Sequence, residues 1–149
     1  MKPEWRFVVS GKAQPGGSKR AFYNKRTGRS VIVDANPKAK AWQGIIAAEA
    51  RKAMGSEPPL SGPLRMCLVF YLDRPRSHYK TGKKGMEFTE KLAKGAPEYP
   101  IYKPDTTKLV RCFEDAMTGI VYEDDTQIVW QEAWKRYGPA GVTVFIAEL

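Results

Sequence analysis

Hydrophobic and polar residues alternate along several stretches of the chain, and such alternation predicts strands with one buried face. The clearest stretch covers residues 64–72, where five apolar side chains fall on one face and Cys67, Val69 and Tyr71 on the other. Apolar residues on both faces indicate a strand that is buried on both sides and lies centrally in a sheet. The other alternating stretches are residues 5–10, 126–137 and 142–147.

Two further stretches repeat their apolar residues every three or four positions, which predicts helices. The first covers about residues 36–54 and is followed by a glycine, a common residue just beyond a helix end. Trp42 falls on its apolar stripe and is expected in the core. The second covers about residues 105–118. Its apolar stripe consists of Leu109, Cys112, Phe113, Ala116 and Met117.

Two segments are rich in lysine, arginine and glycine. Residues 19–33 combine basic and aromatic side chains around a turn signal, which predicts a basic hairpin. Residues 73–100 form a long connection, which we expect to be a mobile basic arm with a short helix over residues 86–94. The predicted order is therefore three strands, a helix, a strand, the arm, a helix and two strands. This order predicts one α+β domain over residues 1–149, with two main helices packed on a mixed or antiparallel sheet.

The length and net charge of the chain limit the classes of function that it can have. A chain of 149 residues is long enough for one domain with its own core. Its formal net charge of +9 favours polyanionic partners bound through salt-sensitive contacts. No apolar run approaches the roughly 20 residues of a membrane span, and the first residues have no secretory signal pattern. We therefore expect a cytoplasmic protein without a membrane partner.

The two cysteines, Cys67 and Cys112, are expected to be reduced core thiols, because disulfides are rare in a reducing compartment. His78 is the only histidine. Together these residues are too few to predict a cysteine-based zinc site.

Two acidic points flank the second predicted helix: Asp105 stands before it, and Asp124 and Asp125 follow it. An aspartate before a helix is commonly a cap, and an acidic run after one is commonly a solvated turn. In a strongly basic protein the same carboxylates also suit a divalent cation that holds a phosphate. We expect the two points to meet around one cation.

An ordered motif runs through this region: Lys103-Pro104-Asp105, then Leu109, then residues 115–119 and 124–128. It resembles the signature of RusA-type Holliday junction resolvases, and a weaker similarity extends over most of the chain. The resemblance implies a small, homodimeric, Mg²⁺-dependent endodeoxyribonuclease, with Mn²⁺ as a substitute, of the kind often encoded by phages. Such an enzyme resolves four-way and other branched DNA by paired symmetric nicks in recombination and repair.

The resemblance also implies residue roles. Asp105 and Asp125 become catalytic metal ligands, and Asp124 adjusts the metal site. Thr107 stands where the family has a second acid; its hydroxyl can bind a hard cation but supplies no charge. Asp115 is a reserve ligand.

Two basic residues of the same helix receive roles in catalysis. Lys108 stands where the family has an asparagine, and Arg111 stands where it has a lysine that acts in catalysis. Because they lie one and two helical turns beyond Asp105, we expect one of them to contact the scissile phosphate or the leaving oxygen. An ion pair between Arg111 and Asp115 is the competing structural explanation for both residues.

The missing acid at position 107 leaves a second interpretation open, a non-catalytic module that binds branched DNA. In both interpretations the two basic segments contact DNA. The expected DNA-binding residues are Lys19, Arg20, Lys25, Arg26, Arg29, Arg74, Arg76, Lys80, Lys83 and Lys84.

Overall fold

A mixed four-stranded sheet forms the centre of the protein, seen in a computed structural model that describes residues 2–82 and 88–149. The strands lie in the order β1-β8-β4-β7. Strand β8 is antiparallel to both of its neighbours, whereas β4 and β7 run parallel. Their bounds are β1 Glu4–Ser10, β4 Leu64–Leu72, β7 Ile128–Tyr137 and β8 Gly141–Glu148.

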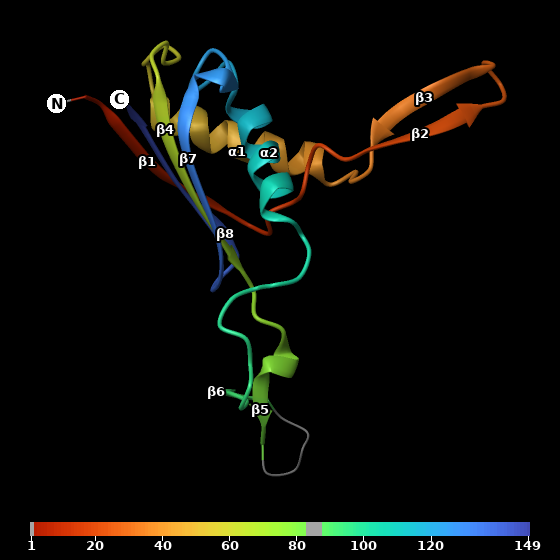
Figure 1. Ribbon diagram of the computed structural model, residues 1–149, viewed down its shortest axis with the longest axis vertical. Coiled ribbons are helices and arrows are strands. Elements are labelled where there is room, and N and C mark those ends of the chain that lie inside the picture. Colours follow the sequence, from red (N-terminus) through yellow and green to blue (C-terminus); the bar gives the residue numbers. More distant parts are fainter. Residues whose placement is uncertain (1, 83–87) are drawn as a thin grey trace.

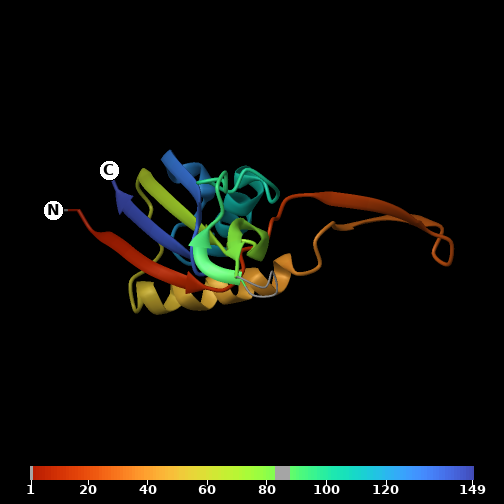
Figure 2. The ribbon, with the colours of Figure 1, turned by 90° about the horizontal axis from the view of Figure 1, so that it is seen from below.

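Two helices, α1 (Ala39–Met54) and α2 (Thr106–Met117), pack on one face of this sheet. Figure 2 shows α1 along that face, beneath the strands. The aromatic rings of Trp42, Phe70 and Phe113 join α1, β4 and α2 in the core, with Phe113 in edge-to-face contact with both others. The α+β fold, the central place of β4 and the core position of Trp42 are confirmed.

The opposite face of the sheet has no helix over it in the part of the chain that the structure describes. The expectation that β4 is buried on both sides is therefore wrong, since Cys67, Val69 and Tyr71 are only half-buried. Arginines stack on the aromatic rings of this open face instead. The Arg65 guanidinium lies 4.2 Å from the ring centre of Trp130 and forms an ion pair of 3.2 Å with Glu132.

The basic hairpin is confirmed as strands β2 (Lys19–Asn24) and β3 (Arg29–Asp34), which pair only with each other. Gly28 supplies the turn with a φ of +67°, and its N–H donates to the carbonyl of Asn24. Figures 1 and 2 show this hairpin extending away from the body of the protein.

The segment after β4 forms a second projection, lower in Figure 1. A short 3-10 helix, Arg76–His78, leads into strands β5 (Tyr79–Thr81) and β6 (Phe88–Leu92), which pair antiparallel. The short helix expected over residues 86–94 is therefore wrong at 88–92, where the chain is extended; residues 86 and 87 lie outside the described residues. Whether this arm is mobile stays a prediction.

The described parts of the chain contain two α-helices and eight strands, and one core lies between the helices and the four-stranded sheet. None of the described helices has the length and apolar character needed to cross a membrane.

Candidate functional site

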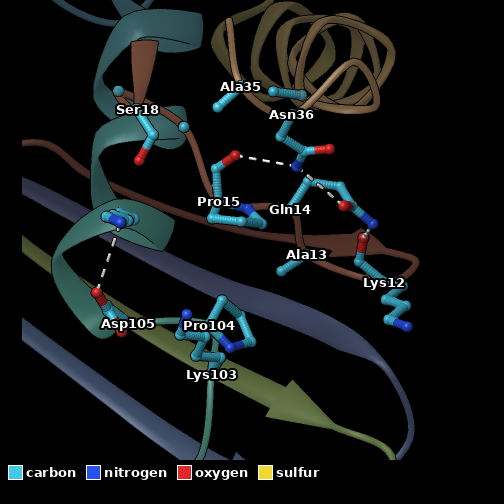
Figure 3. Close-up of a pocket in the computed structure, with 14 residues that line it drawn as sticks. Lys12, Ala13, Gln14, Pro15, Ser18, Ala35, Asn36, Lys103, Pro104 and Asp105 are labelled. Carbon is cyan, nitrogen blue, oxygen red and sulfur yellow. Dashed lines mark hydrogen bonds and ion pairs between the residues drawn. The ribbon is translucent and has the colours of Figure 1, made fainter. Parts of the chain in front are cut away.

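A hollow of about 390 Å³ opens at the N-terminal end of α2, between that helix and the loop of residues 12–18 (Figure 3). The loop packs closely on the helix: the N–H of Gly16 donates to the carbonyl of Lys108 at 2.9 Å. Asn36 holds the loop from the other side, since its amide donates to the Pro15 carbonyl and the Gln14 side chain. Three separate parts of the sequence therefore meet around the hollow.

Asp105 stands at the mouth of α2, in the position of the N-cap residue. Its side chain accepts no capping hydrogen bond from the helix, so the capping explanation of this residue does not hold in the structure. The carboxylate is instead 58% exposed and lies 3.8 Å from the ammonium group of Lys108. It is thus an accessible anion at the edge of the hollow, as Figure 3 shows.

Three lysines line the hollow together with Asp105. They are Lys12, Lys103 and Lys108. The segment before α2 is itself held by Lys135, whose ammonium group donates to the carbonyls of Tyr102 and Pro104 at 2.8 and 3.0 Å. A hollow lined by three lysines and one aspartate suits an anionic ligand, because its formal charge is net positive.

Thr107 and Arg111 face a different side of α2. With Glu114, Gln131 and Ala133 they line a smaller hollow of about 290 Å³ between α2 and strand β7. The Gln131 amide donates to the Glu114 carboxylate at 2.5 Å across this hollow. Arg111 also packs against Gly17, so its exposed side chain lies near the first hollow too.

Asp124 and Asp125 lie beyond the other end of α2, where they begin a short 3-10 helix, Asp125–Gln127. The carboxylate of Asp124 accepts from the Thr126 N–H, and the Gln127 side chain accepts from the Asp124 N–H. Hydrogen bonds to the backbone and side chain of Thr126, together with one to Asp125, hold the pKa of Asp124 below its ordinary value. Gln127 also donates to the carbonyls of Leu60 and Gly62, which fixes this turn beside the start of β4.

The acidic side chains of this end surround Tyr122. Its buried hydroxyl donates to the Glu114 carbonyl at 3.0 Å. Burial and the negative charges of Glu114, Asp125 and Asp115 raise the pKa of Tyr122 far above that of a free tyrosine. These three carboxylates therefore all lie near enough to Tyr122 to act on its hydroxyl electrostatically.

The structure does not bring Asp105 and Asp125 together within one chain. The 12 residues of α2 separate them, which corresponds to roughly 18 Å of helix. Among residues 2–82 and 88–149, no group of three or more histidine, cysteine, aspartate or glutamate side chains is arranged to hold a metal ion. The expected meeting around one cation is thus not found in the single chain, and the roles of the individual residues stay predictions.

The bases of both projections border the hollow that contains Asp105. Ser18 and Ala35, which adjoin β2 and β3, line it directly. A neighbouring hollow of about 240 Å³ shares Lys103 with it and is lined by Asp73 and Pro100, at the two ends of the second projection. The N-terminal end of α2, which Asp105 precedes, therefore lies at the fork between two basic projections (Figure 1).

The expected DNA-binding residues divide between these projections. The hairpin β2–β3 and its turn hold Lys19, Arg20, Lys25, Arg26 and Arg29, and the second projection holds Arg74, Arg76 and Lys80. Lys83 and Lys84 lie outside the described residues. Arg74 is committed to the fold, since its guanidinium donates to the Pro97 carbonyl at 2.6 Å and stacks on Tyr137. This structural role makes Arg74 a poorer candidate for contacting DNA.

Sequence reasoning missed Lys12, Lys103 and Lys135 as parts of the site. The signal for Lys103 was its place directly before Pro104 in the motif. The signal for Lys12 was weaker, a lysine next to a loop with two consecutive glycines. Nothing in the sequence pointed to Lys135, because its role depends on a strand that pairs with β4 and passes beneath residue 104.

Cys67 and Cys112 are both free thiols, as expected, but the expected core position is confirmed for Cys112 alone and is wrong for Cys67. Cys112 is fully buried on α2, and Cys67 is half-buried on the open face of the sheet. Burial, together with the nearby Glu132 carboxylate, raises the pKa of the Cys67 thiol. A raised pKa lowers the thiolate fraction, so Cys67 is a poor nucleophile.

Comparison with known proteins agrees with the motif around α2. The Bacillus subtilis (strain 168) protein named "Uncharacterized protein YqaN" is 31% identical over 98 residues, which span 66% of this chain and 63% of that relative. The family model of "Endodeoxyribonuclease RusA" matches residues 12–147. That match includes both acidic points, the hollow and both projections. The chain belongs to the RusA endodeoxyribonuclease family.

Proposed function

We propose that the protein is a divalent-metal-dependent endodeoxyribonuclease that resolves Holliday junctions and other branched DNA by paired nicks. The observation that carries this proposal is the place of Asp105. Its carboxylate makes no capping hydrogen bond and stands in a lysine-lined hollow at the fork of two basic projections. Membership of an endodeoxyribonuclease family supplies the class of reaction.

In this proposal Asp105 is the central catalytic carboxylate. Lys108, 3.8 Å away, neutralises it in the free protein and contacts a phosphate oxygen when DNA is bound. Arg111 lies one turn further along α2 and approaches the same phosphate from the side of Gly17. Positive groups fixed at this point stabilise the charge that develops on the phosphate and the leaving oxygen.

The two projections hold the DNA arms. Basic side chains on β2 and β3 run along a phosphate backbone, and Phe22 and Tyr23, both exposed, offer surfaces on which bases stack. Two projections that diverge from one hollow suit a branched substrate better than a single straight duplex. Binding through phosphates also predicts a steep loss of affinity with salt.

The metal requirement belongs to the proposal, with Mg²⁺ or Mn²⁺ as the ion. Asp105, Asp124, Asp125 and Thr107 supply the oxygen ligands that these cations prefer. The described residues of a single chain do not gather these groups at one place.

The composition and the free thiols support a cytoplasmic protein that acts on DNA. The two-fold symmetry of a four-way junction favours a homodimer, because a homodimer brings two nuclease sites to one substrate.

A second candidate function is a non-catalytic module that binds branched DNA. Thr107 favours this alternative, because a threonine replaces a site carboxylate and lies on the β7 side of α2, away from Asp105.

A junction-cleavage assay separates the two functions. A labelled synthetic four-way junction and a linear duplex of the same sequence are incubated with the protein, first with Mg²⁺ and then with EDTA. The proposal predicts paired nicks in the junction when Mg²⁺ is present and no nicks with EDTA. Asp105→Asn should lower the nicking rate at least 100-fold, whereas the affinity for the junction should change less than threefold. Glu57→Gln is the matched control. Glu57 is an exposed carboxylate that does not line the hollow of Asp105, so its variant should cut normally.

Tight binding of the junction without nicks under Mg²⁺ or Mn²⁺ would establish the non-catalytic module instead. Normal nicking by Asp105→Asn would remove Asp105 from the site.

A further inference from the structure

The hollow of about 390 Å³ beside Asp105 has a chemical make-up that phosphate binding alone does not explain. Lysines line part of it, but five of its lining residues are alanines and prolines, whose side chains carry no hydrogen-bonding group. Two of these alanines, Ala13 and Ala39, are almost fully buried. A phosphate gains nothing from such groups, whereas a flat and largely apolar ring does. The hollow therefore suits a ligand that joins an anionic group to an apolar one.

Hydrogen bonds to the main chain hold the apolar walls in place on both sides of the hollow. On the loop side, the Asn36 amide donates to the Pro15 carbonyl at 3.1 Å. On the α2 side, the Lys135 ammonium group donates to the Pro104 carbonyl at 3.0 Å. Figure 3 shows Pro15 on the loop and Pro104 before the helix. The space exists before a ligand arrives, so binding costs little free energy for ordering the walls.

Gln14 offers a polar contact within these walls. The Asn36 amide is occupied by the loop, since it donates to Gln14 and Pro15 and accepts from the Lys38 N–H. The Gln14 amide donates to the Lys12 carbonyl at 3.3 Å and accepts from Asn36 at 3.2 Å. A glutamine amide has two donor hydrogens and two acceptor lone pairs, so among the described residues one of each stays available. A donor beside an acceptor matches the edge of a nucleobase.

The charged residues of the hollow suit the sugar–phosphate part of a nucleotide. Lys103 and Lys108 line the same space as the apolar walls, and the Lys108 ammonium group lies 3.8 Å from the Asp105 carboxylate. A base held in the hollow would therefore bring the phosphate joined to it close to Asp105. A base inside an intact duplex is paired and stacked, whereas extrusion costs least for a base that has already lost such contacts, as at a branch point.

We propose that this hollow binds one nucleobase extruded from the branch point of the DNA. The base lies against Pro15 and Pro104, and its edge meets the Gln14 amide. The flanking phosphates lie at Lys103 and Lys108. This inference rests on the proposed action on branched DNA and adds to it a subsite for one unpaired base. It also makes Gln14 a residue that selects among bases.

The fluorescent base 2-aminopurine, placed at successive positions around the branch point of a synthetic junction, reports extrusion. Its fluorescence is quenched by stacking in DNA and rises when the base leaves the stack. With EDTA present to prevent cleavage, saturating wild-type protein should raise the fluorescence about threefold at one position of a strand and much less at the neighbouring positions. The anisotropy of a distant dye on the same junction measures binding independently.

Ala35→Leu tests whether the base enters this hollow. Ala35 is exposed and lines the hollow, so a larger side chain there occupies space that the base requires without disturbing the core. The variant should lose the fluorescence rise, but its affinity for the junction should fall by less than about fivefold, because the contacts of the lysines with phosphates remain. Ala48→Leu is the matched control. Ala48 is exposed on α1 and lies outside the set of lining residues, so its variant should keep the rise.

Gln14→Ala tests recognition of the base. Four junctions that differ only at the responsive position should bind the wild-type protein with affinities that span about tenfold, because an amide that pairs with one base edge mismatches others. In Gln14→Ala the same four affinities should agree within about twofold. A variant that keeps the wild-type order and spread of affinities would remove Gln14 from base recognition.

The outcomes separate this inference from the proposed nuclease. The base-binding subsite is refuted if the junction is bound and no single position responds, or if Ala35→Leu responds like the wild-type protein. A protein that nicks junctions with Mg²⁺ but gives no fluorescence rise keeps the nuclease and loses the subsite. A protein that gives the rise but nicks nothing keeps the subsite and loses the nuclease.

Discussion

Two glycine-to-alanine substitutions, Gly17→Ala and Gly44→Ala, should change the free energy of unfolding in opposite directions. Gly17 lies in the loop over α2 and has a φ of +80°, a conformation that alanine rarely adopts. An added Cβ would also stand 2.6 Å from the Cδ atom of Arg111. Gly44 lies inside α1, where no heavy atom is within 4 Å of an added Cβ.

The magnitudes follow from these environments. The left-handed conformation costs alanine about 1–2 kcal/mol. The contact with Arg111 adds little, because that side chain is long and exposed and can move. Gly17→Ala should therefore lower the free energy of unfolding by about 1–2 kcal/mol. Gly44→Ala should raise it by about 0.5–1 kcal/mol, since alanine restricts the unfolded chain and favours the helix.

Urea denaturation followed by circular dichroism measures both changes. For a chain of this length, 1 kcal/mol corresponds to a shift in Tm of about 2–4 °C. Because Gly17→Ala displaces Arg111, it should also slow junction nicking, whereas Gly44→Ala should not. A Gly17→Ala variant as stable as the wild-type protein would show that the loop does not hold the described conformation over α2, and the hollow around Asp105 would lose its support.

Three further predictions concern the core and the pH dependence of stability. Phe113→Ala should lower the free energy of unfolding, measured by urea denaturation, by about 3–5 kcal/mol, because Phe113 is fully buried against Trp42 and Phe70. Phe22→Ala, on the exposed hairpin, is the control and should change this free energy by less than about 0.5 kcal/mol. Burial raises the pKa of Tyr122 in the folded state, so the stability it contributes is complete below pH 10, the ordinary tyrosine value, and declines as the pH rises above it. Tyr122→Phe should reduce that alkaline decline in urea midpoints measured from pH 8 to 11; an unchanged decline would contradict the burial of the hydroxyl. The pKa of Asp124 is lowered instead, so its contribution is present above pH 3.8 and is lost as the pH falls below it, and Asp124→Asn should make the acid part of the stability curve less steep.

The sequence predicted most of the fold because its signals are local. Alternation identified the four strands of the sheet, and the three-to-four-residue repeat identified α1 and α2. The short helix expected over 86–94 failed at β6, where a hairpin partner in β5 decides the conformation. The open face of the sheet was missed for a similar reason. Apolar residues on both sides of β4 indicate burial, but half-buried Val69 and Tyr71 are compatible with a face that residues 2–82 and 88–149 leave uncovered.

The sequence indicated candidate site residues one by one, but it could not indicate their arrangement. The motif singled out Asp105 and Asp125 through their order along the chain, which carries no information about the distance between them. Lys12 and Lys135 reach the site through a loop and a strand that are distant in sequence. Their contribution becomes visible only when the chain is folded.

The length of α2 connects these observations. A helix of 12 residues with a fully buried stripe is a rigid spacer, so the acidic points at its two ends cannot approach each other by a small movement. The acidic residues that the motif identifies therefore stay apart in the described part of a single chain, although they are close in its sequence. This is the physical reason why the motif can indicate candidate site residues without specifying how they are arranged.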